Sequence, residues 1–464
     1  MKQHLLYGVV LALFLPYIAP AQRMLGVSTD NWSSTRQLYL NPAAIADQKN
    51  KFTVDLFSVN AGFDNNLAGI MPGKAVNQFT SGDSVNVGDF LSFSGRDKFN
   101  MMAPSIEIRG PGALVRLHKN HTIALTTRIR AANQLQGFSQ KFYRSLTDVD
   151  FSKEENSYAL STGKFDWTVH MWSEIGLSYA ATVWNSGPHR LKAGGTIRYL
   201  GGIGYLNINC KNVDVSYFGG RDSIQVTHTN IAVSSNMVND DDIISGMSNG
   251  DFVNRFFESG GSGIGGDIGM IYEYAGETAG SGPTDYLFRV SASVVDIGRI
   301  KYRNDNEIAY LRGHGSLNTR EISDRVTNFS QFKQYVRERG VDVDTSTAVT
   351  TVMQLPTSLI LGADYFIRKS IYINTLFIGS LVNRYEPGVS AYNQLTVTPR
   401  YETKLLTVAV PITYSSLTGN LKAGLGVRVS GFFFGSDDLP VFGSRKYGFN
   451  FYFGACVPFY RKNA

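Results

Sequence analysis

The chain has 464 residues, of which 18% are charged and 12% aromatic, with 47 glycines and a formal net charge of +6. Charged residues fall below the roughly 25% of ordinary soluble domains, and no basic cluster marks a nucleic-acid-binding module, so nucleic acid is excluded as a partner. Two distant cysteines, Cys210 and Cys456, do not make a disulfide framework, and we expect unpaired thiols.

The first residues have the pattern of an export signal. Lys2 precedes an apolar run, Leu5–Ile18, and Ala19-Pro20-Ala21 forms a small-x-small cleavage site. We therefore predict a secretory signal peptide and a mature chain that begins at Gln22. An uncleaved membrane anchor is the alternative, but the apolar run is short and a proline interrupts it.

The segment Gln37–Asp47 reads QLYLNPAAIAD and stands just before the first candidate strand. Pro42 has no backbone N–H and biases Asn41 away from the helical region. Asn41 can also cap a short helical turn that starts at Ala43. The local chemistry therefore predicts a shaped elbow rather than a catalytic motif.

From Lys51 onward the dominant hydrophobic pattern has period 2. Ser173–Trp184 alternates apolar and small or polar residues, and a short turn joins it to Arg190–Leu200, which predicts a hairpin. Lys446–Phe459 places its phenylalanines on one face. Ten further segments alternate in the same way: Lys51–Ala61, Ser105–Leu117, Thr122–Arg130, Ile264–Tyr274, Tyr286–Tyr302, Leu359–Ile367, Ile371–Leu381, Leu395–Glu402, Leu406–Ser415 and Leu421–Phe433.

These segments are longer than the five or six residues usual in globular sheets. Such alternation fits either a transmembrane barrel or a soluble β-sandwich. Strand length, the many small residues on the polar face and the aromatic strand near the C-terminus favour the barrel. Because single-chain bacterial barrels have an even number of strands, the thirteen segments predict an all-β, transmembrane antiparallel barrel of about 14 strands. We assign residues 1–21 to the signal peptide, 22–50 to an N-terminal plug and 51–464 to the barrel.

Four connections are long and polar: Asn65–Pro104, Ser139–Val169, Phe218–Gly263 and Arg303–Leu355. Within the last, Ser323–Arg339 has apolar residues at helical spacing behind a Ser/Asp start, which predicts a short amphipathic helix. We expect this helix to pack on the barrel mouth or inside the barrel, with binding to a partner as the alternative.

Three motifs suggest chemistry, but each has a simpler structural interpretation. Gly261–Gly266 matches G-x-G-x-x-G, yet a strand pattern follows it where a dinucleotide site needs a helix. His118 and His121 are too few for a metal site, and Asp240-Asp241-Asp242 lacks the spacing of a calcium loop. We find no nucleophile–base constellation, and so predict neither an enzyme nor a cofactor or metal site.

Several cations occur on strand faces opposite the apolar residues. A charge on the lipid-facing side would cost a few kcal/mol near the membrane midplane, so we expect these side chains to face the lumen. A basic lumen could favour anions such as carboxylates, or the cations could pair with Glu107, Glu174 and Asp364 as a polar core. The predicted lumen-facing residues are Arg128, Arg130, Arg190, Lys192, Arg198, Arg289 and Arg428.

The Asn41-Pro42-Ala43 motif resembles the segment that precedes the first strand in the long-chain fatty-acid transporter-like barrels, where it belongs to a hatch that plugs the lumen. The chain is also similar to an uncharacterised Bacteroidota outer-membrane family, related to the accessory barrel of the type IX secretion system. The resemblance implies a fourteen-stranded barrel. The chain departs from the transporters in its hatch, because only about thirty residues, Gln22–Lys51, precede the first strand. Besides the elbow, it is carried by Val294–Lys301, Leu355-Pro356-Thr357, Leu361–Tyr365 and Gly424–Asp438.

We therefore expect an outer-membrane β-barrel that binds or passes small hydrophobic or amphiphilic molecules, with Asn41, Pro42 and Ala43 in its plug. The alternative is a closed scaffold or accessory subunit of an outer-membrane secretion or assembly complex. The expected partners are outer-membrane lipid, a small amphiphilic ligand and other outer-membrane proteins.

Overall fold

The computed structural model describes residues 24–46, 48–70, 91–93, 100–138, 158–162, 164–218, 223–236, 260–276, 286–303, 307–326, 329–347, 350–439 and 447–460. The predicted signal peptide and the Asp240–Asp242 triplet lie outside these residues. In the described part, no helix is long and apolar enough to cross a membrane.

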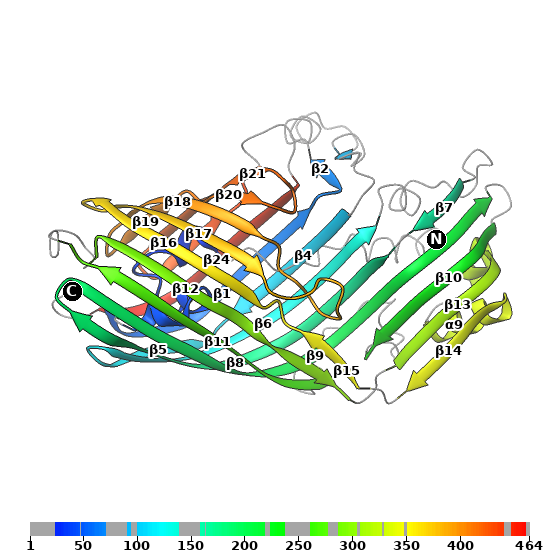
Figure 1. Cartoon of the computed structure of the whole chain (residues 1–464), viewed down its shortest axis with the longest axis horizontal. Helices are drawn as coiled ribbons and strands as arrows, with labels where there is room; N and C mark the ends of the chain where they lie inside the picture. Colours follow the sequence, from blue (N-terminus) through cyan, green and yellow to red (C-terminus); the bar gives the residue numbers. More distant parts are fainter. Residues whose placement is uncertain are drawn as a thin grey trace.

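The described chain forms a closed antiparallel barrel with fourteen strand positions (Figure 1). The ladder closes where β1 pairs with β24, from Phe52 opposite Phe459 to Asp64 opposite Gly448. In chain order the wall consists of β1 (Asn50–Asn65), β4 (Asn100–Arg109) with β5 (Gly112–His118), β6 (His121–Phe138), β8 (Phe165–Ser186), β9 (His189–Phe218), β11 (Gly261–Tyr274), β12 (Phe288–Tyr302), β15 (Thr351–Gln354) with β16 (Ser358–Arg368), β17 (Ile371–Ser380), β18 (Gln394–Glu402), β19 (Leu406–Ala409) with β20 (Ile412–Ser415), β21 (Leu421–Ala423) with β22 (Leu425–Val429), β23 (Phe432–Ser436) and β24 (Gly448–Tyr460).

One unrecognised turn accounts for the difference between the thirteen predicted segments and the fourteen strand positions. The alternation predicts one strand over Leu421–Phe433, but a tight turn at Ser430 and Gly431 divides it, so that β22 and β23 pair as a hairpin. The apolar pattern runs through this turn because both strands expose apolar residues beside it. Gly261–Gly263, which we placed at the end of a long connection, already belongs to β11.

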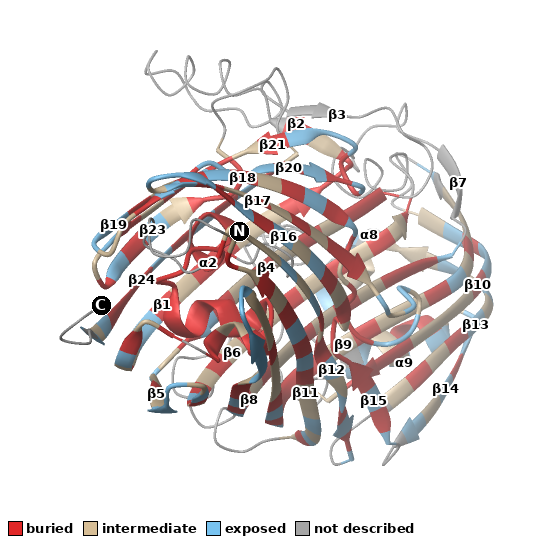
Figure 2. Ribbon diagram, turned by 60° about the vertical axis from the view of Figure 1, so that its left-hand side comes forward, coloured by how far each residue is buried: buried red, intermediate tan, exposed pale blue. Residues whose placement is uncertain are grey.

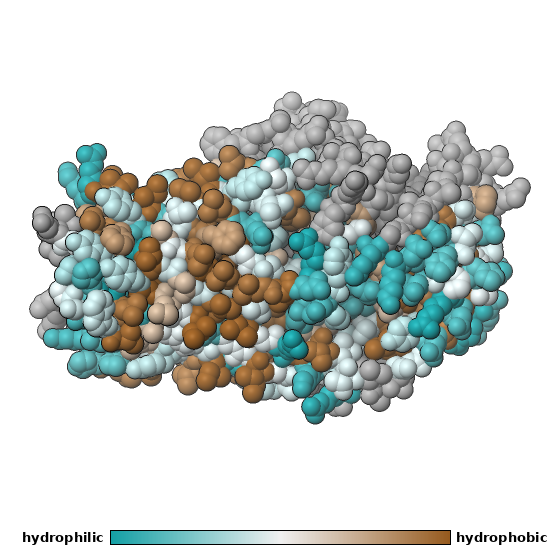
Figure 3. All heavy atoms as spheres, in the orientation of Figure 1, coloured by the Kyte–Doolittle hydropathy of each residue, from teal (hydrophilic) through white to brown (hydrophobic). Residues whose placement is uncertain are grey.

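Alternating side chains point to the outside and to the lumen of the barrel. On β8 the exposed apolar residues run from Ile175 to Trp184. These ten residues cover about 25 Å at about 3.3 Å per residue and a tilt of about 40°, which is the height of the apolar band on transmembrane barrels. Figure 3 shows this apolar belt over the left half of the molecule, with hydrophilic residues at its left rim and over most of the right half.

Further strands of the same sheet extend the wall beyond the belt, and we call them the extension sheet. The distal half of β9 pairs with β10 (Ser223–Ser235), β10 pairs with β13 (Glu307–Asn318), and β13 pairs with β14 (Val341–Thr347). These strands lie within connections that we expected to be loops. One face of these strands is polar and exposed, so they lack the apolar outer surface of the belt, which explains the error.

The predicted helix at Ser323–Arg339 is two helices, α8 (Thr319–Arg325) and α9 (Phe329–Glu338). Val326, Tyr335 and Val336 are buried against apolar residues of β13 and β14. The helices therefore cover the extension sheet, and not the barrel mouth or lumen. Their packing on their own chain agrees with the preferred sequence interpretation.

Short turns connect most neighbouring strands at the end of the barrel where β1 begins and β24 ends, at the left in Figure 1, and residues 275–287 join β11 to β12 there. We call this the turn end. Long connections, the extension sheet and the two helices lie at the opposite end, which we call the loop end.

Candidate functional site

Residues 24–46 lie inside the barrel, and we call them the plug. The plug contains a one-turn helix, α2 (Leu25–Ser28), and two 3-10 turns, η1 (Ser34–Tyr39) and η2 (Pro42–Ile45). Within 24–46 every residue except Ala44 is buried. Figure 2 shows these buried helical turns enclosed by the strands.

The Asn-Pro-Ala elbow attaches the plug to the wall at β9, β11 and β12. The Asn41 side-chain oxygen accepts a hydrogen bond from the Ala43 amide at 2.9 Å and caps η2. Its amide nitrogen donates to the Met270 carbonyl at 3.1 Å and the Ala292 carbonyl at 3.2 Å. One side chain thus stabilises the elbow and links it to two neighbouring strands.

Two glycines allow this close approach. A Cβ added to Gly194 would lie 2.7 Å from the Pro42 carbonyl and from the Ala43 amide nitrogen, closer than real Cβ contacts allow. A Cβ added to Gly269 would overlap Asn41. The elbow therefore occupies a niche in the wall that exists because these two positions have no side chain.

The other end of the plug contacts β22 and the residues after β23. The Asp437 carboxylate accepts hydrogen bonds from the Leu25 amide at 2.9 Å and the Gly26 amide at 3.1 Å. Gly26 and Gly426 approach so closely that a Cβ on either would overlap the other backbone. The plug is thus fixed to two separate parts of the wall.

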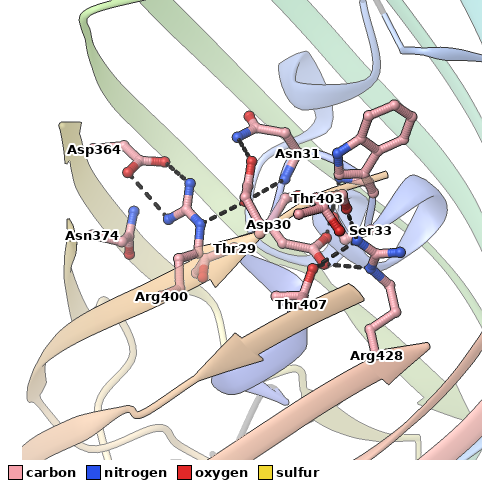
Figure 4. Close-up of polar contacts among 12 residues, drawn as sticks. Thr29, Asp30, Asn31, Ser33, Asp364, Asn374, Arg400, Thr403, Thr407 and Arg428 are labelled. Atoms are coloured by element: carbon pink, nitrogen blue, oxygen red, sulfur yellow. Dashed lines mark hydrogen bonds and ion pairs between the residues drawn. The ribbon is translucent and has the colours of Figure 1, made fainter. Parts of the chain in front are cut away.

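Asp30 makes the main ion pair of the plug near the turn end. Its carboxylate accepts hydrogen bonds from Arg428 Nε at 2.7 Å and from the Thr407 hydroxyl at 2.8 Å (Figure 4). Burial alone would raise the pKa of Asp30, but Arg428 and Arg36 outweigh it and hold the pKa below its usual value. The ionised carboxylate is therefore the stable form in the folded chain.

A neighbouring network joins the plug to β16 and β18. Arg400 binds Asp364 with its two terminal nitrogens at 3.1 and 2.6 Å, and its Nε donates to Glu402 at 2.8 Å. Asn31 of the plug donates both its backbone and side-chain N–H groups to Glu402. Figure 4 shows this network beside the Asp30–Arg428 pair.

A larger charge cluster fills the lumen beside Tyr39. Arg128 contacts Glu107 at 3.1 Å, Glu174 at 2.7 Å and Asp296 at 2.8 Å. The guanidinium groups of Arg109 and Arg128 lie 4.0 and 4.7 Å from the centre of the Tyr39 ring. Burial raises the pKa of the Tyr39 phenol, although both arginines oppose this. The aromatic ring thus joins the plug to cations that are already paired with carboxylates.

The structure gives a position for each cation that the sequence suggested. Arg128, Arg130, Lys192, Arg198 and Arg428 are buried, whereas Arg289 is part-buried and Arg190 half-buried near the turn end. Lys192 and Arg289 both contact Glu273, at 2.7 and 2.8 Å. Sequence reasoning omitted three buried lumen cations, which the same alternation could have identified: Arg109, Arg400 and Lys422.

The plug also covers apolar parts of the inner wall. Leu25 and Leu40 pack against Val295, Ile360 and Ile378 of β12, β16 and β17. On another side, a second cluster brings Leu38, Ile45 and Ala46 against wall residues Leu114, Ala124 and Ala180. The inner wall beneath the plug therefore combines apolar surface with paired arginines.

Little free space is left between plug and wall. A cavity of about 20 Å³ lies beside Tyr39 and Arg130, and one of about 50 Å³ lies beside Asn41, Ser291 and Gly362. Each is large enough for one or a few waters. Within the described ranges, no group of three or more His, Cys, Asp or Glu side chains is arranged to hold a metal ion, and Cys210 and Cys456 are unpaired.

A family model matches residues 42–437, from the elbow to the Asp437 contact. The chain belongs to the family of unknown function DUF5723. The match covers the barrel wall almost entirely. No curated protein matches the chain.

Solved structures that match the DUF5723 chain are also barrels. The toluene transporter TbuX of Ralstonia pickettii is 11% identical, with 97% of this chain and 100% of that one covered and a TM-score of 0.41. A deletion mutant of the TodX monoaromatic hydrocarbon channel is 9% identical over 92% and 93%, with a TM-score of 0.40. The outer-membrane protease OmpT of Escherichia coli is 10% identical over 89% and 97%, at 0.25. Similarity this low assigns neither substrate nor activity to this chain.

Proposed function

We propose that this DUF5723 chain is an outer-membrane barrel whose N-terminal plug is a gate for small amphiphilic molecules. The observation that supports this best is the surface under the plug. It offers apolar side chains, such as Val295 and Ile378, on one side and paired arginines, such as Arg128, on the other. Such a surface suits a solute with an apolar body and a polar group.

The plug is the part of the chain that can move without opening the wall. The fourteen-position ladder is closed by β1 and β24, so its hydrogen bonds do not depend on the plug. Hydrogen bonds and ion pairs hold the plug at a few points, such as Asn41, Asp30 and Asp437. The neutral hydrogen bonds among them can be exchanged for water at a net cost of about 0.5–1.5 kcal/mol each.

A reversible lock tests this function. The Thr35 hydroxyl lies 2.6 Å from the Asp55 carboxylate, so Thr35→Cys with Asp55→Cys places a thiol on the plug next to one on β1. Cys456 lies opposite Asp55 in the ladder. It is therefore replaced by alanine in the double-cysteine chain and in its control, to prevent a disulfide with the wrong cysteine. The measurement is uptake of hydrophobic acids and of matched neutral alcohols into liposomes.

We expect uptake by the reduced chain, no uptake by the oxidised chain, and the fastest uptake after deletion of residues 22–47. A chain that carries only Cys456→Ala controls for the oxidant. If the reduced chain and the deletion both take up every solute no faster than empty liposomes do, the gate is refuted.

A second candidate function is a scaffold subunit of an outer-membrane assembly. The extension sheet with α8 and α9 stands outside the apolar belt, and β14 pairs on one side only, with β13, among the described strands. A free strand edge can add a strand from another protein. Purification from native membranes tests this role: a chain recovered without a stoichiometric partner speaks against it.

A further inference from the structure

The turn end of the barrel carries a rim of basic side chains. Lys51, Lys119, Arg368 and Lys369 are exposed there, while Lys49, Arg116, Arg190 and Lys404 are partly exposed. Among the described residues, the exposed carboxylates all lie at the loop end or on the extension, where exposed arginines accompany them: Asp324, Glu338, Asp342, Asp344 and Glu386. The rim is therefore basic, whereas the loop end has mixed charge.

The rim cations stand directly beside outward-facing apolar residues of the belt. Leu117 is 61% exposed two positions before Lys119, Ile367 is 50% exposed next to Arg368, and Leu405 is 59% exposed next to Lys404. The same arrangement thus occurs in three different hairpins. It places a positive charge at the level where the apolar surface ends.

Aromatic side chains mark this level as a membrane interface. The Tyr272 hydroxyl lies 2.6 Å from His189 Nδ1. Trp184, 48% exposed, stacks beside His189. Amphipathic rings of this kind prefer the headgroup region of a bilayer.

We propose that this rim binds the headgroups of anionic phospholipids in the leaflet that the turn end faces. The acyl chains then lie on the apolar belt, and the phosphate or glycerol-phosphate oxygens meet the lysine and arginine heads. A cation next to an exposed apolar side chain matches both halves of one phospholipid. An acidic protein partner would instead need cations on the axial face of the turns. The proposal does not depend on movement of the plug.

Lipid competition tests the rim. The full chain is placed in bilayers, and binding of brominated phosphatidylglycerol is compared with that of brominated phosphatidylcholine with the same chains, through quenching of tryptophan fluorescence. The rim variant combines Lys51→Gln, Lys119→Gln, Arg368→Gln and Lys369→Gln. The matched control removes four exposed charges beyond the belt, at the loop end: Lys211→Gln, Lys301→Gln, Arg303→Gln and Arg312→Gln.

We expect wild type and control to prefer phosphatidylglycerol at least tenfold, more strongly at low salt. Each rim cation removed should weaken the preference on the order of fivefold at most, because a basic residue near a membrane surface contributes about 1 kcal/mol. A second variant replaces each of the three rim lysines by arginine and Arg368 by lysine. This variant should keep the preference for phosphatidylglycerol. Gel migration of the unheated chain verifies that each variant is a folded barrel.

Equal binding of both lipids by the wild-type chain overturns the proposal, as does an equal loss in the control variant. Poly-glutamate is added to the chain in phosphatidylcholine bilayers as a stand-in for an acidic protein. If the rim binds poly-glutamate and phosphatidylglycerol does not displace it, the ligand of the rim is an acidic protein and the lipid proposal is wrong.

Discussion

At the scale of single residues, Arg128 connects carboxylates from three strands, Glu107 on β4, Glu174 on β8 and Asp296 on β12. Arg128→Met would leave these buried acids with fewer cations. Breaking a buried pair from one side costs about 3–5 kcal/mol, so we expect the free energy of unfolding in urea to fall by this amount. Arg190→Met, at a half-buried position, is the control and should change it by less than about 1 kcal/mol. Equal losses in the two variants would contradict the role of the cluster.

The Asp30–Arg428 pair predicts the pH dependence of the plug contact. Because the folded pKa of Asp30 lies below its usual value, the pair contributes stability above the unfolded pKa of about 3.9. This contribution is lost only as the pH falls through the lower, folded value. We therefore expect the difference in melting temperature between wild type and Asp30→Asn to stay constant from pH 5 to 8 and to shrink below pH 4. A difference that disappears between pH 5 and 6 would show that Asp30 is protonated there.

At the scale of elements, the fit between elbow and wall depends on missing side chains. Gly194→Ala would place a methyl group 2.7 Å from the backbone of Pro42 and Ala43, which forces the elbow away from β9. At a typical overpacking cost of about 1–3 kcal/mol, the plug amides should exchange hydrogen roughly 5- to 150-fold faster. Gly195→Ala is the neighbouring control, because its Cβ would meet only the Asp267 carbonyl at an ordinary 3.5 Å. If the plug amides of Gly194→Ala exchange hydrogen as slowly as those of the wild type, the niche is not what anchors the elbow.

For the barrel as a whole, the proposed membrane location places the apolar belt in lipid and the extension sheet in water. Leu177, 62% exposed near the middle of the belt on β8, should tolerate charge poorly. Leu177→Arg should cost about 2–4 kcal/mol of folding free energy in bilayers, as expected near the midplane. Gln225→Arg on the exposed face of the extension should cost almost nothing. Equal costs would mean that the extension also lies in the membrane, or that the belt does not.

Period-2 alternation was enough to predict the barrel, because each strand has an apolar outer face and a polar lumen face, and this difference alternates residue by residue. The alternation predicted the wrong strands where the two faces of a strand do not differ in this way. The turn at Ser430 and Gly431 lies between two apolar strands, and β10, β13 and β14 have one polar face that is exposed to water. Likewise, the cations of the lumen follow from alternation, but their partners come from strands that are distant in sequence, such as Asp296 for Arg128.

Local patterns in the chain are enough to specify the class of fold and the shape of the Asn-Pro-Ala elbow, since proline geometry and asparagine capping are local. Only the tertiary structure decided that Asn41 bonds to carbonyls on β11 and β12, that Gly194 and Gly269 make room for it, and that the plug lies between two apolar surfaces and a set of paired arginines. These facts depend on which residues meet when the sheet closes on itself. That closure brings together segments up to about 400 positions apart, as in the pair of Asp30 and Arg428, and no local pattern contains it.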